Sequence, residues 1–291
     1  MKVIPIRRPL VTKLAGLPDG RFVAGFDDGS LQIFDVYPGH GERVAWDNNP
    51  PYGGVNDIAV LPSGQIAISF ADCWLRIYDP LNYECVGMRE YEHSVNALAV
   101  LPDDLLACGT ESGVIHTLHT LSGKPIEGWT AHDQGVLSIA ALPGGLLASG
   151  SYDGEVKIWD LNKGTCKGTI ECGDALADVT TNKAVHCMSA LPDGFLVLGV
   201  VGCSNVLLCS IEELQDVGIF CQIGLVRALE VSPNGRLAVA TEFRAIALWN
   251  VEAGNKINAL HGHHDHVRAM TILADGRLVS ADDDTIRVWD L

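Results

Sequence analysis

A short turn phrase recurs seven times along the chain. It first reads Leu17-Pro18-Asp19-Gly20, and its second residue returns as Pro62, Pro102, Pro143, Pro192, Pro233 and Ala274. Successive second residues lie 44, 40, 41, 49, 41 and 41 positions apart. A period of about 40 to 45 residues is the length of four strands in one propeller blade. Because repeats pack only on their neighbours, we expect all 291 residues to form one repeating domain, 1–291.

The residues around each phrase are typical of strands. Pro presets the first turn position and Asp or Gly tolerates the next ones, so the phrase is a tight hairpin. In the fourth repeat an apolar run, 145–150, follows the phrase, and the segment 155–160 alternates apolar and polar side chains. A fourth, more exposed strand fits over 166–170. The sequence therefore predicts an all-β fold, a single closed seven-bladed β-propeller with four antiparallel strands per blade.

The two ends of the chain are expected to meet in one blade. The seventh repeat stops at Leu291, directly after its third strand, and the segment 2–7 precedes the first repeat. This segment is long enough to supply the missing strand of blade 7. Ring closure of this kind would cover sheet edges that otherwise invite aggregation.

Three dipeptides carry a resemblance to a known family. Trp159-Asp160 and Trp289-Asp290 end third strands, and Gly262-His263 precedes a first strand. The chain thereby resembles the WD-repeat family over essentially its whole length. In that family a His, a Ser or Thr, an Asp and the Trp form a hydrogen-bonded network inside a blade. The resemblance implies two such networks here: His132, Ser149, Asp153 and Trp159 in the fourth repeat, and His263, Ser280, Asp283 and Trp289 in the seventh. Leu118 and Leu208 replace the Trp in the third and fifth repeats, whose blades we expect to rely on packing alone.

One aligned column is expected to surround the mouth of the central channel. It lies six positions before the second residue of each phrase and contains Thr12, Asn56, Asn96, Leu137, His186, Arg227 and Arg268. Three consecutive members, His186, Arg227 and Arg268, form a basic sector on a chain of net charge −16. Such a sector suits a carboxylate, a phosphate or an acidic side chain of a partner, because Arg binds these groups bidentately. The alternative interpretation is that each Arg pairs with a neighbouring Asp or Glu.

Turn residues on the same face add candidate anchors. Tyr152 lies in the second turn of the fourth repeat, and Phe243 and Arg244 hold that turn in the sixth. Exposed aromatic side chains often dominate the binding energy of protein interfaces. We therefore expect the channel-mouth face to bind partners. The long interval of 49 residues places an insertion over 172–184, either a tolerated surface loop or a rim loop that contacts a partner.

Signatures of catalysis are missing. The sequence has no G-x-S-x-G, H-E-x-x-H, Walker or G-x-G-x-x-G pattern. The histidine-rich stretch from His261 to His266 is dense enough for a zinc site, but His263 belongs to the Gly-His pair, and we favour an exposed loop. We predict no catalytic residue, no metal and no cofactor. The expected function is a protein-interaction scaffold or adaptor; the alternatives are a reader of an acidic or modified peptide at the channel mouth, and a propeller-based hydrolase or metal enzyme.

Charge and cysteine usage bear on partners and compartment. A net charge of −16 disfavours nucleic acids and anionic lipid surfaces. No apolar run of about 18 residues or more is present, so no membrane span is expected, and the first ten residues do not resemble a secretory signal. Nine cysteines without a C-x-x-C pair are typical of free thiols in a reducing compartment, the cytoplasm or the nucleus. The expected partners are proteins or peptides, one of them with an acidic segment, bound by a monomeric propeller within a hetero-complex.

Overall fold

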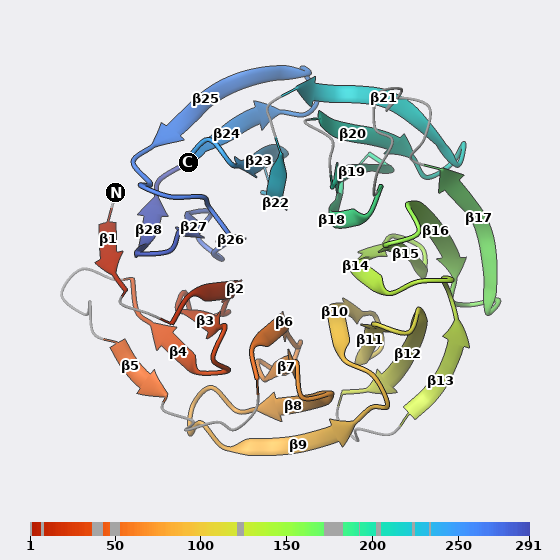
Figure 1. The fold of residues 1–291 in the computed structure, drawn as a ribbon, viewed down its shortest axis with the longest axis horizontal. Helices are drawn as coiled ribbons and strands as arrows, with labels where there is room; N and C mark the ends of the chain where they lie inside the picture. Colours follow the sequence, from red (N-terminus) through yellow and green to blue (C-terminus); the bar gives the residue numbers. More distant parts are fainter. Residues whose placement is uncertain are drawn as a thin grey trace.

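The computed structural model describes residues 2–6, 9–36, 43–46, 53–120, 125–171, 183–191, 193–201, 205–222, 225–232 and 234–291. Within these ranges the chain forms seven four-stranded antiparallel sheets around a central axis (Figure 1). The prediction of an all-β, seven-bladed propeller is confirmed. Most of the insertion predicted over 172–184 lies outside the described residues, which resume at Lys183.

Each blade follows one repeat. Blade 1 contains β2 (Val11–Gly16), β3 (Phe22–Phe26), β4 (Leu31–Phe34) and β5 (Arg43–Trp46). Blade 2 contains β6 (Val55–Val60), β7 (Ile66–Phe70), β8 (Trp74–Tyr78) and β9 (Cys85–Glu90). Blade 3 contains β10 (Val95–Leu101), β11 (Leu105–Thr110), β12 (Val114–His119) and β13 (Pro125–Thr130). Blade 4 contains β14 (Val136–Leu142), β15 (Leu146–Ser151), β16 (Glu155–Asp160) and β17 (Thr165–Glu171).

The remaining blades continue the pattern. Blade 5 contains β18 (Val185–Ala190), β19 (Phe195–Val200), β20 (Asn205–Ser210) and β21 (Gln215–Gln222). Blade 6 contains β22 (Val226–Val231), β23 (Arg236–Thr241), β24 (Ala245–Asn250) and β25 (Asn255–His261). Blade 7 contains β26 (Ala269–Ile272), β27 (Leu278–Ala281), β28 (Thr285–Trp289) and β1 (Lys2–Pro5). In every blade the first of these strands is innermost and the last lies on the rim (Figure 1).

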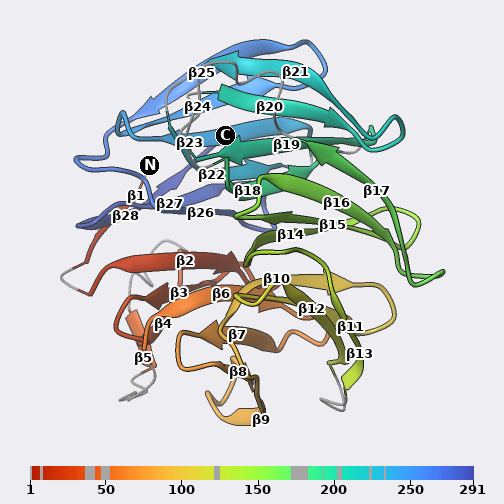
Figure 2. The same ribbon diagram turned by 45° about the vertical axis from the view of Figure 1, so that its right-hand side comes forward.

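The N-terminal strand closes the ring as predicted. β1 pairs antiparallel with β28, in a register that runs from Lys2 opposite Val288 to Pro5 opposite Thr285. Arg7, the last residue of the predicted segment, lies outside the described residues. N- and C-terminal strands therefore share one sheet, and the two ends of the chain lie near each other (Figures 1 and 2).

The apolar core is divided into seven clusters, one between each pair of adjacent blades. Between blades 3 and 4, for example, Leu101 and Ile115 pack with Val136, Leu147 and Trp159. The same arrangement recurs around the ring, including the contact between blades 7 and 1. Each blade is therefore stabilised by its two neighbours, as expected for a repeat protein.

Glycine in the second strand allows two neighbouring blades to approach closely. A Cβ at Gly109 would lie 2.5 Å from a methyl of Val136, which begins the next blade. Gly150 stands in the same relation to Val185, at 2.6 Å. Real Cβ atoms do not approach so closely, so these blade interfaces need the absence of a side chain.

The network predicted for blade 4 is present. His132 lies 2.9 Å from Asp153 through Nδ1 and 2.8 Å from the Ser149 hydroxyl through Nε2. The Trp159 indole N–H donates to the same hydroxyl over 2.9 Å. Because indole can only donate, the Ser149 hydroxyl must give its own hydrogen to His132 Nε2, and Nδ1–H then donates to Asp153.

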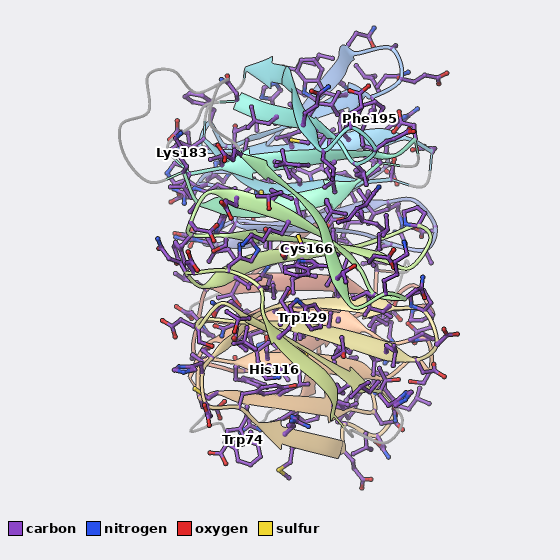
Figure 3. The ribbon with its side chains drawn as sticks, turned by 90° about the vertical axis from the view of Figure 1, so that its right-hand side faces the viewer. Trp74, His116, Trp129, Cys166, Lys183 and Phe195 are labelled. Atoms are coloured by element: carbon purple, nitrogen blue, oxygen red, sulfur yellow. The ribbon has the colours of Figure 1, made fainter. Side chains whose placement is uncertain are left out.

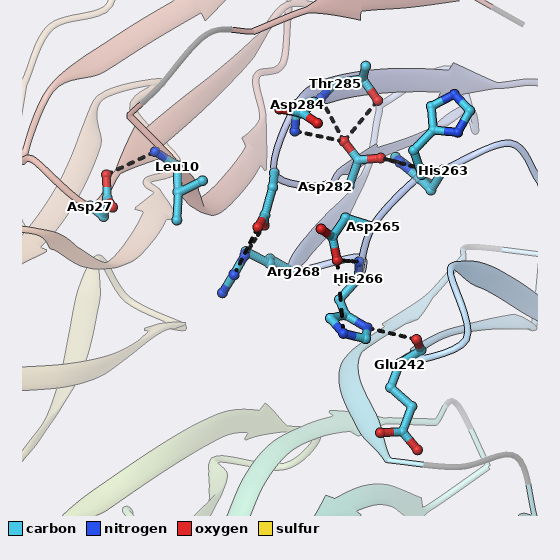
Figure 4. A network of polar contacts seen from close by, with 12 residues as sticks. Leu10, Asp27, Glu242, His263, Asp265, His266, Arg268, Asp282, Asp284 and Thr285 are labelled. Carbon is cyan, nitrogen blue, oxygen red and sulfur yellow. Dashed lines mark hydrogen bonds and ion pairs between the residues drawn. The ribbon is translucent and has the colours of Figure 1, made fainter.

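In blade 7 the predicted acid was wrong by one residue. Asp282, not Asp283, binds His263 Nδ1 over 2.7 Å, while Ser280 bridges His263 and Trp289 as predicted. Burial alone would raise the pKa of Asp282, but hydrogen bonds from His263 and from the N–H groups of His264 and Asp284 hold it below its usual range. The turn before Thr285 is one residue shorter than in blade 4. The network carboxylate comes from the first residue of this shorter turn, two positions after Ser280, whereas Asp153 lies four positions after Ser149. Figure 4 shows Asp282 beside His263.

Blades 3 and 5 carry other residues at the network positions. In blade 3, Leu118 pairs with Leu106 as Trp159 pairs with Leu147, so its predicted place is correct. In blade 5 the same position belongs to Cys209 and not to Leu208, because Cys209 is the residue opposite Leu196. Both side chains are buried, which agrees with apolar packing at these positions.

Candidate functional site

The residues of the predicted mouth column are set apart by the backbone. In six blades the register of the two inner strands shifts by one residue at this column, which marks a β-bulge. A bulge leaves one residue unpaired and re-aims its side chain. The unpaired residues are Thr12, Asn56, Asn96, Leu137, His186 and Arg227. Arg268 directly precedes β26, and its N–H donates to Ala281 over 2.9 Å.

All seven column residues line one cavity along the central channel. The cavity has a volume of about 750 Å³ and includes Tyr152 and Glu111 at its edge. Asn56 and Asn96 each donate a side-chain N–H toward the next blade, to Val95 and Val136, which leaves their amide oxygens as acceptors. The bulges thus place a ring of re-aimed side chains at the channel mouth.

Arg268 is not a free cation. Its guanidinium binds the Asp283 carboxylate through both Nε and Nη2, the second contact at 3.3 Å (Figure 4). Asp283 can bind Arg268 because Asp282, and not Asp283 as predicted, occupies the acid position of the blade 7 network. The alternative interpretation of the basic sector therefore holds for Arg268.

Arg227 differs from Arg268. It is exposed at the mouth, and its guanidinium has no hydrogen bond or ion pair with any residue that the structure describes. His186 stands one blade away; enclosure in the channel, followed by repulsion from Lys13 and Arg227, lowers the pKa of His186. At neutral pH the mouth therefore offers one unpaired cation, Arg227, beside a neutral imidazole.

The predicted anchors lie at different places. Tyr152 is 45% exposed and borders the cavity. Phe243 is 66% exposed but lies outside the cavity lining, in the turn between β23 and β24. Arg244 follows it with φ of 60° and is also outside the cavity lining. The carbonyl of Glu242 in the same turn accepts a hydrogen bond from His266, which precedes β26 of blade 7.

Four charged or polarisable residues inside the channel were not predicted. Lys13 and Asp57 follow the column by one position and form an ion pair of 3.3 Å; Cys187 and Glu230 also line the cavity. Strand alternation could have found them, because the residues after a bulge return to a fixed inward period. The sequence search followed only the mouth column, so it missed Lys13, Asp57 and Cys187 one position further along their strands and Glu230 three positions after Arg227.

One group could in principle hold a metal. His132, Asp153 and Glu155 offer ligand atoms within 4.8 Å of one another, and they are the one such group among the described residues. Both imidazole nitrogens of His132 are already occupied by Asp153 and Ser149. Since metal binding needs a free ring nitrogen, this group serves the blade network.

Comparison with known proteins identifies two repeats of one family in the chain. The family described as "WD domain, G-beta repeat" matches residues 123–160 and 254–290, which end at the two Trp-Asp dipeptides. Two segments of the chain are therefore WD repeats. They include the Trp and Asp residues of the networks in blades 4 and 7.

Several known proteins are similar to part or most of this chain. Rat "Telomerase protein component 1" is 24% identical over 93% of the chain, which spans 11% of that relative's length. The rat "Apoptotic protease-activating factor 1" is 31% identical over 48% of the chain, again a small part (12%) of the relative. "Target of rapamycin complex subunit LST8-1" of Arabidopsis thaliana is 24% identical over 79% of the chain and 78% of its own length.

A solved structure shares the fold of this chain. A chain of the "Crystal Structure of Mitotic Checkpoint Complex" superposes with a TM-score of 0.82 over 100% of this chain and 91% of that one. The two are 19% identical, so the likeness concerns the fold alone.

Proposed function

We propose that the chain is a non-catalytic interaction subunit that binds protein partners through the channel-mouth face. The observation that carries this proposal is Arg227: an exposed guanidinium at the rim of a 750 Å³ cavity, with no partner among the described residues, on a chain of net charge −16. The names of two relatives, a telomerase component and a complex subunit, agree with a protein that works inside assemblies.

The rigidity of the ring supports this function. The mouth side chains project from bulges of the innermost strands, which are anchored by the interblade clusters. Little conformational entropy is lost when a partner meets side chains already held in place. Tyr152 at the cavity edge adds an exposed aromatic group beside Arg227.

Within this function, recognition of an acidic or modified peptide is the favoured mode. An unpaired Arg binds a carboxylate bidentately, and the neighbouring neutral His186 can donate one more hydrogen bond. The basic sector predicted from the sequence is thus limited to His186 and Arg227, because Arg268 pairs with Asp283.

Charge reversal at Arg227 tests the proposal. We expect Arg227→Glu to lose a partner that the parent chain retains in affinity capture from native lysate, because a repulsive carboxylate then faces the acidic segment. Lys256→Glu is the matched control: it makes the same charge change on β25, the exposed outer strand of the same blade. Thermal melting would confirm that both variants are folded. Equal retention by the parent and by Arg227→Glu would place docking elsewhere.

We also place the protein in a reducing compartment, the cytoplasm or the nucleus. Among the cysteines whose side chains the structure describes, free thiols occur at Cys73, Cys85, Cys108, Cys166 and Cys187, and those of Cys85 and Cys166 are exposed. Within these ranges, no helix is both long and apolar enough to cross a membrane.

A further inference from the structure

The channel below the mouth carries three charged side chains. Lys13 and Asp57 form their ion pair from β2 and β6, and Glu230 lines the same cavity from β22. Ala97, Ala228 and Ala269 occupy the corresponding wall of other blades, so little else fills the space. Within the described ranges, this part of the channel therefore holds one basic and two acidic side chains.

The Asp57 carboxylate is both ion-paired and hydrogen-bonded. Besides Lys13, its carboxylate accepts the backbone N–H of Leu98 at 2.8 Å and that of Ile58 at 3.0 Å. Glu230 has no hydrogen bond and no ion pair with any residue in the described ranges. A carboxylate in a cavity is costly unless it is paired or hydrogen-bonded. Among the described residues, Glu230 thus lacks a cationic partner.

The pKa of Glu230 agrees with the absence of a cationic partner for it among the described residues. Burial raises the pKa of Glu230 to about 8, against the attraction of Lys13 and with the repulsion of Asp57. Cys187, which faces the same space from β18, stays neutral because burial raises its pKa to about 12. A cation that entered the channel would favour the ionised form of Glu230 and would release its proton.

Arg227 and Glu230 lie on one strand, three residues apart. At a rise of about 3.3 Å per residue they are separated by less than about 10 Å along the channel, since the bulge shortens the path. The mouth thus presents the Arg227 cation and the interior presents the Glu230 carboxyl group, which ionises when a cation binds, at a spacing that one short zwitterionic segment can span.

We propose that the channel accepts a lysine or arginine side chain of the docked protein partner, whose cationic group pairs with Glu230 while a carboxylate of the same segment binds Arg227. This inference rests on the proposed function and adds the sequence class of the bound segment: a basic residue next to an acidic one. Charge complementarity at both positions selects this occupant, because a purely acidic segment would leave Glu230 unpaired and a purely basic one would meet Arg227.

Binding of a simple zwitterion tests the inference without any protein partner. The probe is 6-aminohexanoate, with hexanoate and n-hexylammonium as probes that lack one charge each, titrated calorimetrically into the full chain at low salt. We expect 6-aminohexanoate to bind at least about tenfold more tightly than either single-charge probe. Its affinity should rise about tenfold from pH 6 to pH 7 and level off above pH 8, because the ammonium stays charged while Glu230 ionises.

Two variants test which residue binds each charged group of the probe. Glu230→Gln should abolish the advantage of 6-aminohexanoate over hexanoate and the pH dependence, and Arg227→Gln should abolish its advantage over n-hexylammonium. Glu252→Gln, the same change on an exposed turn of blade 6, should alter neither. If Glu230→Gln failed to melt cooperatively, the probe comparison and the pH profile of the parent chain would still decide.

The possible failures are separable. Equal binding of hexanoate and 6-aminohexanoate, lost in Arg227→Gln but kept in Glu230→Gln, would overturn the channel inference and leave the acidic-segment function intact. No binding of any probe to the parent would also overturn it, while partner capture through Arg227 is decided by its own experiment.

Discussion

Asp282→Ala is expected to lower the free energy of unfolding by about 3–5 kcal/mol, because the change leaves a set of buried donors unpaired. The Asp282 carboxylate is fully buried and accepts from His263 Nδ1 at 2.7 Å and from the His264 N–H at 3.0 Å. It also accepts from the Asp284 N–H, the Thr285 N–H and the Thr285 hydroxyl. Urea unfolding followed by two spectroscopic probes measures the loss.

Asp283→Ala is the matched control for this prediction. Asp283 lies one position away and pairs with Arg268, whose side chain is 45% exposed. An exposed ion pair contributes about 1 kcal/mol or less, so this variant should unfold close to the parent. Comparable losses for the two variants, or a larger loss for Asp283→Ala, would contradict the assignment of Asp282 to the blade 7 network.

Gly113→Ala is expected to lower the free energy of unfolding by about 2–5 kcal/mol, since left-handed strain of about 1–2 kcal/mol adds to a backbone clash of about 1–3 kcal/mol. Gly113 has φ of +81°, and a Cβ there would lie 2.2 Å from the His132 carbonyl oxygen. Its own carbonyl accepts the His132 N–H at 3.0 Å, so blade 3 and the blade 4 network share this contact. Thermal and urea unfolding would measure the effect.

Gly64→Ala isolates the backbone strain. Gly64 has φ of +85°, but nothing lies within 4 Å of the position of its added Cβ. We expect a loss of about 1–2 kcal/mol there. If Gly113→Ala destabilised the chain no more than Gly64→Ala, the close approach of blades 3 and 4 would have no energetic weight.

The fold could be predicted from the sequence because the turn phrase and the strand alternation repeat together. Seven blades and the closing strand follow from that repetition, whereas the blade 4 network follows from the resemblance to the WD-repeat family. The errors occurred where a repeat changes length or lacks its marker residue. In blade 7 a turn shorter by one residue made Asp283 look equivalent to Asp153, and in blade 5 the missing Trp left Leu208 and Cys209 indistinguishable.

The channel mouth could be predicted in position but not in charge. A constant offset from the turn phrase found every residue of the column, since each bulge lies at the same place in its blade. Whether an Arg is free depends on contacts across turns: Asp283 is 15 residues from Arg268 in the chain, and nothing in the local pattern links them. The same holds for Lys13 and Asp57, which meet from two blades.

Site-specific photocrosslinking tests most directly whether partners dock at the channel mouth. A benzoylphenylalanine replaces Tyr152 at the cavity edge, and in a second protein it replaces Ile257, 47% exposed on the outer strand β25. We predict a crosslinked partner from position 152 and none from position 257, with the crosslink lost when Arg227→Glu is added. Crosslinking from position 257 alone, or from position 152 regardless of Arg227, would contradict the account.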